Sequence, residues 1–559
     1  MIKPEKIFFK IGQHSFLIAL AVIFSFPFIW MIAASGKVDR EMFGEKKTLF
    51  PQSPEPVLIS PYIDTSEFPE PLRPEDVSQK DYDRLKKSLS KVIYSAVTNA
   101  NLQLPGKFKN SAEKEITQGL WKRVVALTPY SYWTNLAINP DLIAERATRK
   151  KEIKEIFNQC HRRFSIRLSR VRDEDMTVYN LDLDKSITSI WCSLNPEAAV
   201  LKEQKNASLD YANIFYNFES TNEVSFQAEF SLPFPATNFL QYSLAYRPDN
   251  SWHRLYAEII GGGKKYISAE PVYLFDYVWA GAIWQKPSKQ DSEIKIQRWT
   301  KLKLIDEGPE FDLGDNKIKV ILHLKQSSKA QAWWGKLSRN YISTFKYIPF
   351  WRYIGTSAFL VILNIIGTLF SSTLVAYAFS RLRWPGRDSL FLLLLATLMI
   401  PAQVTMIPGF IIMKWFGWYN TLQPLWVFSF CGNAFYIFLL RQFMRGIPND
   451  LEDAAKIDGC GFLRIYWNVV LPLIKPTMAA IAIFTFMGVW NDFMGPLIYL
   501  SDHRLYPLSL GLFSLNVQAG GNFGMMMAGS FLMTLPVIII FFFAQKYFIQ
   551  GITLTGMKG

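Results

Sequence analysis

Long uncharged, apolar stretches constrain this chain more than any other feature of its sequence. The first stretch, Phe16 to Ala34, lies near the N-terminus, and the others all follow Trp351. About 20 consecutive apolar residues are long enough to cross the hydrocarbon core of a bilayer as one helix. The sequence therefore predicts an α-helical polytopic membrane protein with six transmembrane helices. The five later spans are expected at Tyr353 to Ser380, Ser389 to Met413, Leu425 to Leu440, Pro476 to about Leu500, and Phe523 to Ala544.

The first stretch also fits a cleavable signal peptide, because a basic start precedes the apolar run and Ala33-Ala34 ends it. The length of the run and its content of Pro27 and Trp30 favour a retained helix instead. Under both interpretations the residues that follow are exported. We expect residues 1–36 to form a short tail and transmembrane helix 1.

A polar block, residues 37–345, separates the first span from the second. Its proline-rich start predicts an extended connector. Apolar residues recur at helical spacing from Val77 to Ala96, and another helix is expected from Leu142 to Phe157. From Phe164 onward, short runs alternate between apolar and polar residues, which is typical of a β-sandwich. The block is therefore predicted to be a large extracytoplasmic α+β insert, built on a β-sandwich, between helices 1 and 2.

The formal net charge is +14, from 61 basic and 47 acidic residues. A basic chain can bind nucleic acid, but many of these residues sit at the ends of uncharged stretches, as the positive-inside rule describes for membrane proteins. They cluster at the N-terminus, at 381–387, at 441–475 and in the C-terminal tail. We therefore expect a multi-pass membrane protein with both termini in the cytoplasm, the insert outside, and no nucleic-acid partner.

No chemical reaction is evident from the sequence. The histidines and the four cysteines show no zinc-site spacing, so no metal is expected. A phosphate-binding loop is also missing, since GITLTGMK at 551–558 lacks a lysine directly after its second glycine. Cys160 and Cys192 lie in the insert, where an oxidising compartment could allow a disulfide, and the alternative is two buried free thiols. No catalytic residue and no cofactor are assigned.

Residues 446–476, between the fourth and fifth spans, form an amphipathic segment of mixed charge. Asn449 can cap a helix, with Glu452 reaching back to the cap as in a capping box. Asp458-Gly459 would end this helix, because glycine adopts the left-handed conformation at little cost. The expected apolar faces consist of Leu451, Ala454, Ala455 and Ile457 on the first helix, and of Leu463, Tyr466, Trp467 and Val470 on a second helix, Phe462 to Val470, which Pro472 and Pro476 would end.

This segment resembles the EAA loop of ABC-transporter permeases. Asp453-Ala454-Ala455 stands at the Glu-Ala-Ala position, with Asp in place of Glu, and Asp458-Gly459 and Leu471-Pro472 follow. Other segments resemble the inner-membrane permease subunit of maltose-type carbohydrate importers. They are AYAFSRLRWPGRDSLFLLLLATLMIPAQVTMIP at 376–408, FLLRQFMRGIPNDLEDAAKIDG at 438–459, FTFMGVWNDFMGPLIYL at 484–500 and FIQGITLTGMKG at 548–559.

The resemblance implies a permease subunit of an ATP-driven carbohydrate importer. Its partners would be a second permease, two ATP-binding subunits and an extracytoplasmic solute-binding protein. ATP would be hydrolysed on a separate chain, and the cytoplasmic loop 446–476 of the permease core, residues 346–559, would couple hydrolysis to transport. The expected ATPase-coupling residues are Leu451, Glu452, Asp453, Ala454, Ala455, Asp458, Gly459, Leu471 and Pro472.

A polar interruption in the fifth span is a candidate for the substrate pathway. It consists of Trp490, Asn491, Asp492 and Phe493. Ionisable residues within a span are costly and often functional. The alternative is that Asn491 and Asp492 break the helix and bind backbone groups there.

The insert departs from the resemblance, which implies only a short loop at this place. Because aromatic rings stack on sugars, the insert could dock the solute-binding protein or hold carbohydrate near the entrance, or its aromatic residues could simply fill the core. The alternative to a permease is a membrane-anchored extracytoplasmic carbohydrate-binding or sensor protein, which would need no coupling loop. The tryptophans considered are Trp252, Trp279, Trp284, Trp333 and Trp334.

Overall fold

The computed structural model describes the whole chain except residues 1–3, 45–47, 103–108, 135–140, 182–184, 205–209, 289–297, 519–521 and 553–559. The chain forms two compact units. The first comprises chiefly Met1–Gln52 and Leu337–Gly559, and the second comprises Ser53–Ser292 and Arg298–Lys336. Helix α9 (Lys329–Tyr347) contributes residues to both units.

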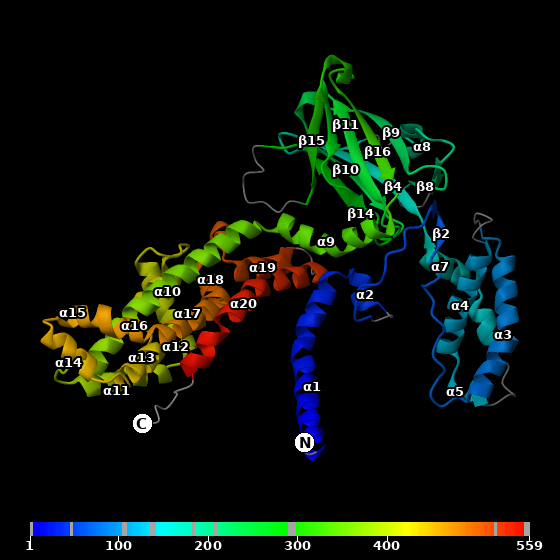
Figure 1. The fold of residues 1–559 in the computed structure, drawn as a ribbon. Helices are drawn as coiled ribbons and strands as arrows, with labels where there is room; N and C mark the ends of the chain where they lie inside the picture. The colour runs from blue at the N-terminus through cyan, green and yellow to red at the C-terminus, as the bar shows by residue number, and fades with distance from the viewer. Residues whose placement is uncertain are drawn as a thin grey trace. The chain divides into compact units, whose positions relative to one another are not determined.

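The first unit is helical, and four of its described segments are long and apolar enough to cross a membrane (Figure 1). Two bent helix pairs reach the same length and apolarity, so the described residues hold up to six spans if each pair is one span. The number six therefore stays a prediction. The four segments are Gly12–Ser35 in α1 (Pro4–Ser35), Phe350–Arg381 (α10), Val427–Arg445, which ends in α13 (Ala434–Arg445), and Phe523–Gln545 in α20 (Phe523–Ile552). The bent pairs are Arg387–Met399 with Ala402–Trp415, at 98°, and Phe462–Leu473 with Lys475–Trp490, at 76°.

Shorter helices complete the first unit. They are α2 (Asp39–Phe43), α11 (Arg387–Ala396), α12 (Ala402–Trp415), α14 (Asp450–Ile457), α15 (Phe462–Ile465), α16 (Leu471–Leu473), α17 (Lys475–Trp490), α18 (Met494–Tyr499) and α19 (Leu508–Gln518).

Helix α10 packs against its neighbours through small and polar residues. The Asn364 amide donates to the backbone oxygen of Leu425 at 3.0 Å, and the Ser371 hydroxyl donates to that of Ser429 at 2.9 Å. A side chain at Gly367 would collide with Ser429. Small residues and hydrogen bonds of this kind hold helices together where apolar burial gives no advantage over lipid.

The second unit contains a fourteen-stranded sheet with the strand order β1-β8-β4-β10-β14-β15-β12-β11-β16-β9-β6. β5 pairs with β4, β7 with β8 and β13 with β11, while β2 and β3 form a separate pair. The strands are β1 (Ile59–Ser60), β2 (Tyr62–Ile63), β3 (His161–Arg162), β4 (Phe164–Asp173), β5 (Val178–Leu181), β6 (Trp191–Ser193), β7 (Ala199–Gln204), β8 (Tyr211–Asn217), β9 (Glu223–Ser231), β10 (Phe239–Arg247), β11 (Arg254–Gly261), β12 (Lys264–Ser268), β13 (Val272–Tyr273), β14 (Ala280–Gln285), β15 (Thr300–Glu307) and β16 (Lys317–Lys325).

This sheet folds back on itself around one core. The rings of Phe230 in β9 and Tyr242 in β10 are 6.1 Å apart, although their strands are far apart in the strand order. Trp284 of β14 is fully buried in the same core and stacks on Tyr242, with ring centroids 6.0 Å apart. The parallel pairing of β14 with β15, at Trp284–Thr300 and Gln285–Lys301, joins the two halves. The structure therefore has one continuous curved sheet where the sequence predicts a sandwich of two.

A bundle of five helices accompanies the sheet within the second unit. Tyr82, Trp121 and Trp133 pack together in its core. Its first helix begins two residues later than predicted, because the Ser78 side chain accepts from the Asp81 amide and caps it. The predicted helix Leu142 to Phe157 is divided in two. The helices are α3 (Gln79–Asn99), α4 (Lys109–Leu127), α5 (Tyr130–Thr134), α6 (Asp141–Ala147) and α7 (Lys150–Cys160).

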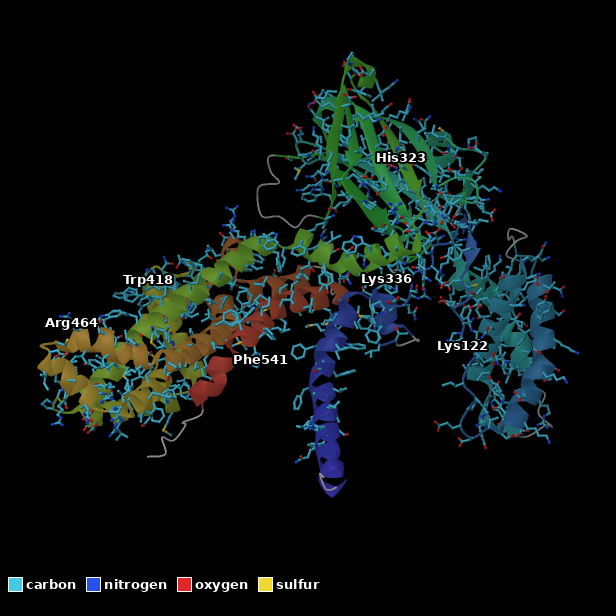
Figure 2. All side chains as sticks on the ribbon, in the orientation of Figure 1. Lys122, His323, Lys336, Trp418, Arg464 and Phe541 are labelled. Carbon is cyan, nitrogen blue, oxygen red and sulfur yellow. The ribbon has the colours of Figure 1, made fainter. Side chains whose placement is uncertain are left out.

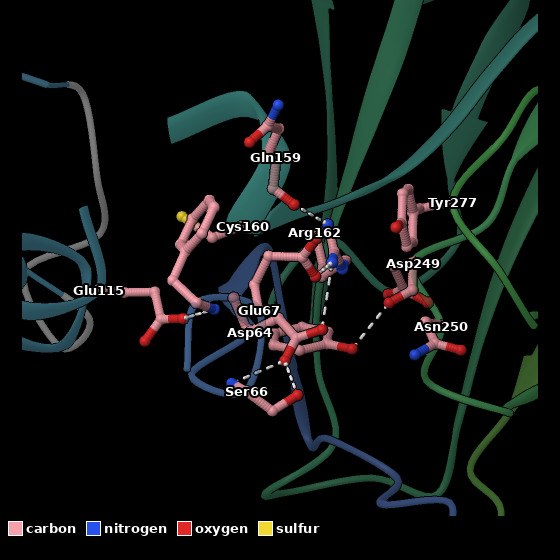
Figure 3. Close-up of polar contacts among 12 residues, drawn as sticks. Asp64, Ser66, Glu67, Glu115, Gln159, Cys160, Arg162, Asp249, Asn250 and Tyr277 are labelled. Atoms are coloured by element: carbon pink, nitrogen blue, oxygen red, sulfur yellow. Dashed lines mark hydrogen bonds and ion pairs between the residues drawn. The ribbon is translucent and has the colours of Figure 1, made fainter. Parts of the chain in front are cut away.

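Arg162 of β3 holds the residues that follow β2 (Figure 3). Its fully buried guanidinium group pairs with Asp64 at 3.1 Å and with Glu67 at 2.7 Å. The same group lies 3.8 Å from the ring centroid of Tyr277. Two carboxylates and an aromatic face thus offset the cost of burying this charge.

The possible disulfide between Cys160 and Cys192 does not form in the structure, since both are free cysteines. Cys160 is buried in the core of the helical bundle, whereas Cys192 lies exposed on β6. The two thiols do not pair because one is enclosed in the core of the bundle and the other is exposed on the sheet. Their separate environments could not be read from their shared location in the insert.

Candidate functional site

The EAA-like segment, residues 446–476, contains the predicted helix–turn–helix but differs in how it begins. Helix α14 starts without a side-chain cap, because Asn449 is itself in helical conformation and its side-chain oxygen accepts from Arg381 at 2.5 Å. Glu452 forms an ion pair with Arg381 at 3.1 Å and is buried. The predicted capping box is therefore wrong. Three acidic residues in the first turn stabilise the positive end of the helix dipole instead.

The turn after α14 is formed as predicted. Gly459 has φ +78°, in the left-handed region that favours glycine. The amide of Gly459 donates to the oxygen of Lys456 at 2.9 Å, and that of Cys460 donates to the oxygen of Ala455 at 2.9 Å. These two bonds form a Schellman motif, which satisfies the carbonyl groups at the end of the helix.

The second half of the segment is less regular than predicted. Helix α15 is followed by a π-helical turn at Tyr466–Val470 and then by α16. Pro472 does not end the helix, because it lies in the first turn of α16, where a missing N–H group is tolerated. The chain bends by 76° at Ile474 and continues as α17.

The side chains of this second half also divide differently from the prediction. Tyr466 and Val470 are buried, whereas Leu463 and Trp467 are exposed. The π-helical turn changes the helical spacing, so the four residues do not share one face. Tyr466 donates to or accepts from the Thr373 hydroxyl of α10 at 2.7 Å.

Arg381, the last residue of α10, fastens the start of the segment. Its guanidinium group donates to the backbone oxygens of Met444 and Ile447 in addition to contacting Asn449 and Glu452. Its side chain is only 6% exposed. Sequence analysis assigned Arg381 only to a basic cluster. Arg381 lies far from Asn449 and Glu452 along the chain, so the sequence does not indicate that they are in contact.

The outer surface of the segment is apolar and acidic. Asp453 is also exposed and pairs with Lys456 at 2.8 Å, while Leu471 is half-buried. Arg464 of α15, labelled in Figure 2, is exposed as well. Large apolar groups exposed on a polar segment mark interaction surfaces. The exposed apolar side chains are Leu451 (46%), Ile457 (87%), Phe462 (63%), Leu463 (69%) and Trp467 (58%).

The polar interruption at the end of α17 makes local contacts. The Asn491 amide donates to the oxygen of Met487 at 2.9 Å, and an Asp492 side-chain oxygen accepts from the Gly495 amide at 3.1 Å. Trp490 is buried and donates to the oxygen of Met533 at 3.1 Å. Asn491 and Asp492 thus bind backbone groups where one helix ends and α18 begins. Asn491 is the exposed residue of this set of four.

The tryptophans of the insert divide between core and surface. Trp252 and Trp284 are buried, so these two fill cores. Trp279 and Trp333 are half-buried, and Trp334 is 71% exposed. Within the described part of the chain, no group of three or more His, Cys, Asp or Glu residues is placed to hold a metal ion.

Comparison with known proteins identifies the membrane part of the chain. The family model for binding-protein-dependent transport system inner membrane components matches residues 367–554. The arabinooligosaccharides transport system permease protein AraQ of Halalkalibacterium halodurans is 36% identical over 210 residues, which are 38% of this chain and 75% of that protein. AraQ of Bacillus subtilis is 35% identical over 210 residues, which are 38% of this chain and 74% of that protein.

The lactose transport system permease protein LacG of Rhizobium radiobacter is 35% identical over 184 residues, which are 33% of this chain and 67% of that protein. All three relatives are transport permeases and not enzymes. The resemblance found in the sequence is therefore confirmed, and the function is transport across a membrane. The chain belongs to the family of binding-protein-dependent transport system inner membrane components.

Proposed function

We propose that this chain is the transmembrane permease subunit of an ATP-driven carbohydrate importer. It forms the translocation pathway with a second permease and works with two ATP-binding subunits and an extracytoplasmic solute-binding protein. The family membership and the sugar names of the relatives support this proposal.

The observation that carries the proposal is the surface of α14. A helix with exposed Leu451 and Ile457 and an exposed, acidic Asp453 fits a groove on an ATP-binding subunit. Arg381 fastens the start of this helix to the end of α10. A displacement of α14 on ATP binding is therefore passed to a membrane helix by a buried ion pair rather than by a flexible loop.

In the proposed orientation the N-terminus, the C-terminus and the EAA-like segment face the cytoplasm. The insert, residues 37–345, then faces the side from which an importer receives its solute. Asn491, exposed at the end of α17, is our candidate for contact with substrate, and Trp490, Asp492 and Phe493 support the helix break that presents it.

The test compares two glycines on the same turn. At Gly459 an added Cβ atom meets no atom within 4 Å, but φ +78° costs a residue with a Cβ atom about 1–2 kcal/mol. Gly461 is equally open, but its φ of −73° suits any residue, so Gly461→Val is the matched control. We expect Gly459→Val to lower substrate-stimulated ATP hydrolysis and uptake in the reconstituted complex, and Gly461→Val to leave both near normal.

Normal uptake by the Gly459→Val complex would contradict the coupling role. Uptake that does not depend on this chain at all would favour the alternative, a membrane-anchored extracytoplasmic carbohydrate-binding or sensor protein.

A further inference from the structure

Strand alternation places several arginines on the outer face of the insert sheet. Phe164 and Ile166 of β4 are fully buried in the core, so Arg163, Ser165 and Arg167 lie on the opposite face. The register of β4 is irregular just after Ile166, where a bulge inserts a residue. Arg167 lies at this bulge and keeps its side chain outside the core.

The neighbouring strands add to the same face. Tyr246 of β10 is buried in the core, so Arg247 lies outside it, and Trp279 lies beside Arg247 because Ala280 pairs with Tyr246. On β8, Ala212 is in the core and Tyr211 is therefore on the outer face, where only 9% of it is exposed. β8, β4, β10 and β14 are adjacent in the sheet. We call Arg163, Arg167, Tyr211, Arg247 and Trp279 the arginine patch.

The aromatic rings of the arginine patch hold two of its guanidinium groups. The guanidinium carbon of Arg167 lies 4.3 Å from the ring centroid of Trp279. That of Arg247 lies 5.6 Å from Trp279 and 5.7 Å from Tyr211. Arg247 also donates to the Ser165 hydroxyl at 3.3 Å. A cation–π contact uses the flat face of a guanidinium group, so the N–H groups along its edge stay available for an anion.

No carboxylate neutralises these charges in the part of the chain that the structure describes. None of Arg163, Arg167 and Arg247 forms an ion pair there with an acidic side chain, and the buried Arg163 Nε and His161 Nδ1 have no hydrogen-bond partner. Burial lowers the pKa of Arg163, and burial together with Arg163 lowers the pKa of Arg247 to about 10. With a pKa of about 10, the Arg247 guanidinium group is still charged at neutral pH. Like charges gathered without a counter-charge are unfavourable unless an anion joins them.

The spacing of the charges indicates the kind of anion. Arg163 and Arg167 are four residues apart on an extended strand, which separates their Cα atoms by about 13 Å. A chain molecule with several anionic groups can contact guanidinium groups that are spread along a strand in this way. Carboxylates bind guanidinium edges with two parallel hydrogen bonds.

We propose that the arginine patch binds an acidic oligosaccharide through its carboxylate groups. This inference rests on the proposed carbohydrate function for the choice of ligand class. Binding to the purified chain is measured without transport, however, so a failure of uptake and a failure of this site are distinguishable.

The test uses the full-length chain in lipid nanodiscs and calorimetric titration. The probes are a hexamer of galacturonic acid, its fully methyl-esterified and therefore neutral form, and inorganic phosphate. We expect the acid hexamer to bind at least about tenfold more tightly than its ester and more tightly than phosphate, with an affinity that falls as salt rises. The double variant Arg163→Gln/Arg247→Gln should weaken binding of the acid hexamer about tenfold or more.

Two further variants keep the result interpretable. Arg170→Gln removes an exposed arginine of the same strand, whose side chain contacts Asn180 at 2.8 Å, and should change the affinity by less than about twofold. Arg167→Gln removes only a contact with Trp279 and should weaken binding even if the double variant fails to fold. Equal affinity for the acid and its ester, or unchanged binding by Arg167→Gln and the double variant, would overturn the proposal. Adsorption to phosphatidylglycerol vesicles through these arginines, without binding of the hexamer, would overturn it in favour of a lipid surface.

Discussion

Cys160 shows how burial controls a single side chain in the insert. It lies at the end of α7 in the core of the helical bundle, and its thiol donates to the oxygen of Phe157 at 3.4 Å. Burial, followed by the charge of Glu115, raises the pKa of the thiol to about 12. Because the thiolate is the nucleophile, this residue stays protonated and inert at any pH up to well above neutral.

We predict that the two cysteines of the insert react very differently. At pH 8, iodoacetamide should modify the exposed Cys192 rapidly in the native chain and Cys160 only after denaturation, as measured by intact mass. Without reductant, denatured chain should be alkylated fully at both positions. If the denatured chain were alkylated at both cysteines only after reduction, the two thiols would not be free.

Residue-level features were predictable where they depend on local backbone geometry. The positive φ of Gly459 follows from the Asp-Gly turn alone, and the structure confirms it. Glu452 was instead assigned to a capping box with Asn449. That local pattern does not reveal the ion pair with Arg381, which lies far away along the chain. A tertiary ion pair with a buried partner outweighs a local cap of about 1 kcal/mol.

At the scale of elements, the long helices α10 and α20 were the most predictable, since an uncharged stretch of that length has few alternatives in a membrane protein. Strands β4, β9 and β16 follow from period-two alternation. The parallel pairing of β14 with β15 could not be predicted. The sequence between the two strands does not indicate that they are neighbours in the sheet. Helix α16, which contains Pro472, was not predicted either. It follows a π-helical turn, and such a turn depends on packing.

Arg381 is the contact through which two elements, α10 and α14, act together. Its guanidinium group and the Glu452 carboxylate are 6% and 9% exposed. Removing one partner of a buried ion pair leaves an uncompensated charge and costs about 3–5 kcal/mol. That cost falls on the attachment of α14 and not on the membrane helix, whose backbone bonds are unaffected.

We therefore predict that Arg381→Ala releases α14. Hydrogen exchange in nanodiscs should become much faster in residues 447–458 and stay unchanged in the middle of α10, and coupled ATP hydrolysis should fall. Arg383→Ala is the matched control, because Arg383 is exposed two residues away and the same charge is lost. Equal protection of residues 447–458 in both variants would show that Arg381 does not hold the helix.

At the scale of the whole molecule, topology links the proposed roles of the two units. Basic residues at 381–387 and 441–475 surround the EAA-like segment, and the positive-inside rule places them in the cytoplasm. An insert that follows the first span then lies outside, where an acidic oligosaccharide bound by the arginine patch would be presented before import. A reversed orientation would contradict the coupling role of the EAA-like segment, whereas binding of the acid hexamer to the purified chain does not depend on orientation.

Orientation is testable with cysteines at exposed positions of each unit. Cys192 is exposed in the insert, and Ile457→Cys places a thiol on α14 at a position that is 87% exposed. With Cys431 and Cys460 replaced by serine, a membrane-impermeant maleimide should label Cys192 in cells whose outer barrier has been opened. The thiol at position 457 should react only after the inner membrane is permeabilised, because a charged reagent does not cross the hydrocarbon core. Permeabilised cells control for accessibility at both positions. Labelling of position 457 in intact spheroplasts, with Cys192 protected, would reverse the proposed orientation and remove the EAA-like segment from the reach of a cytoplasmic ATPase.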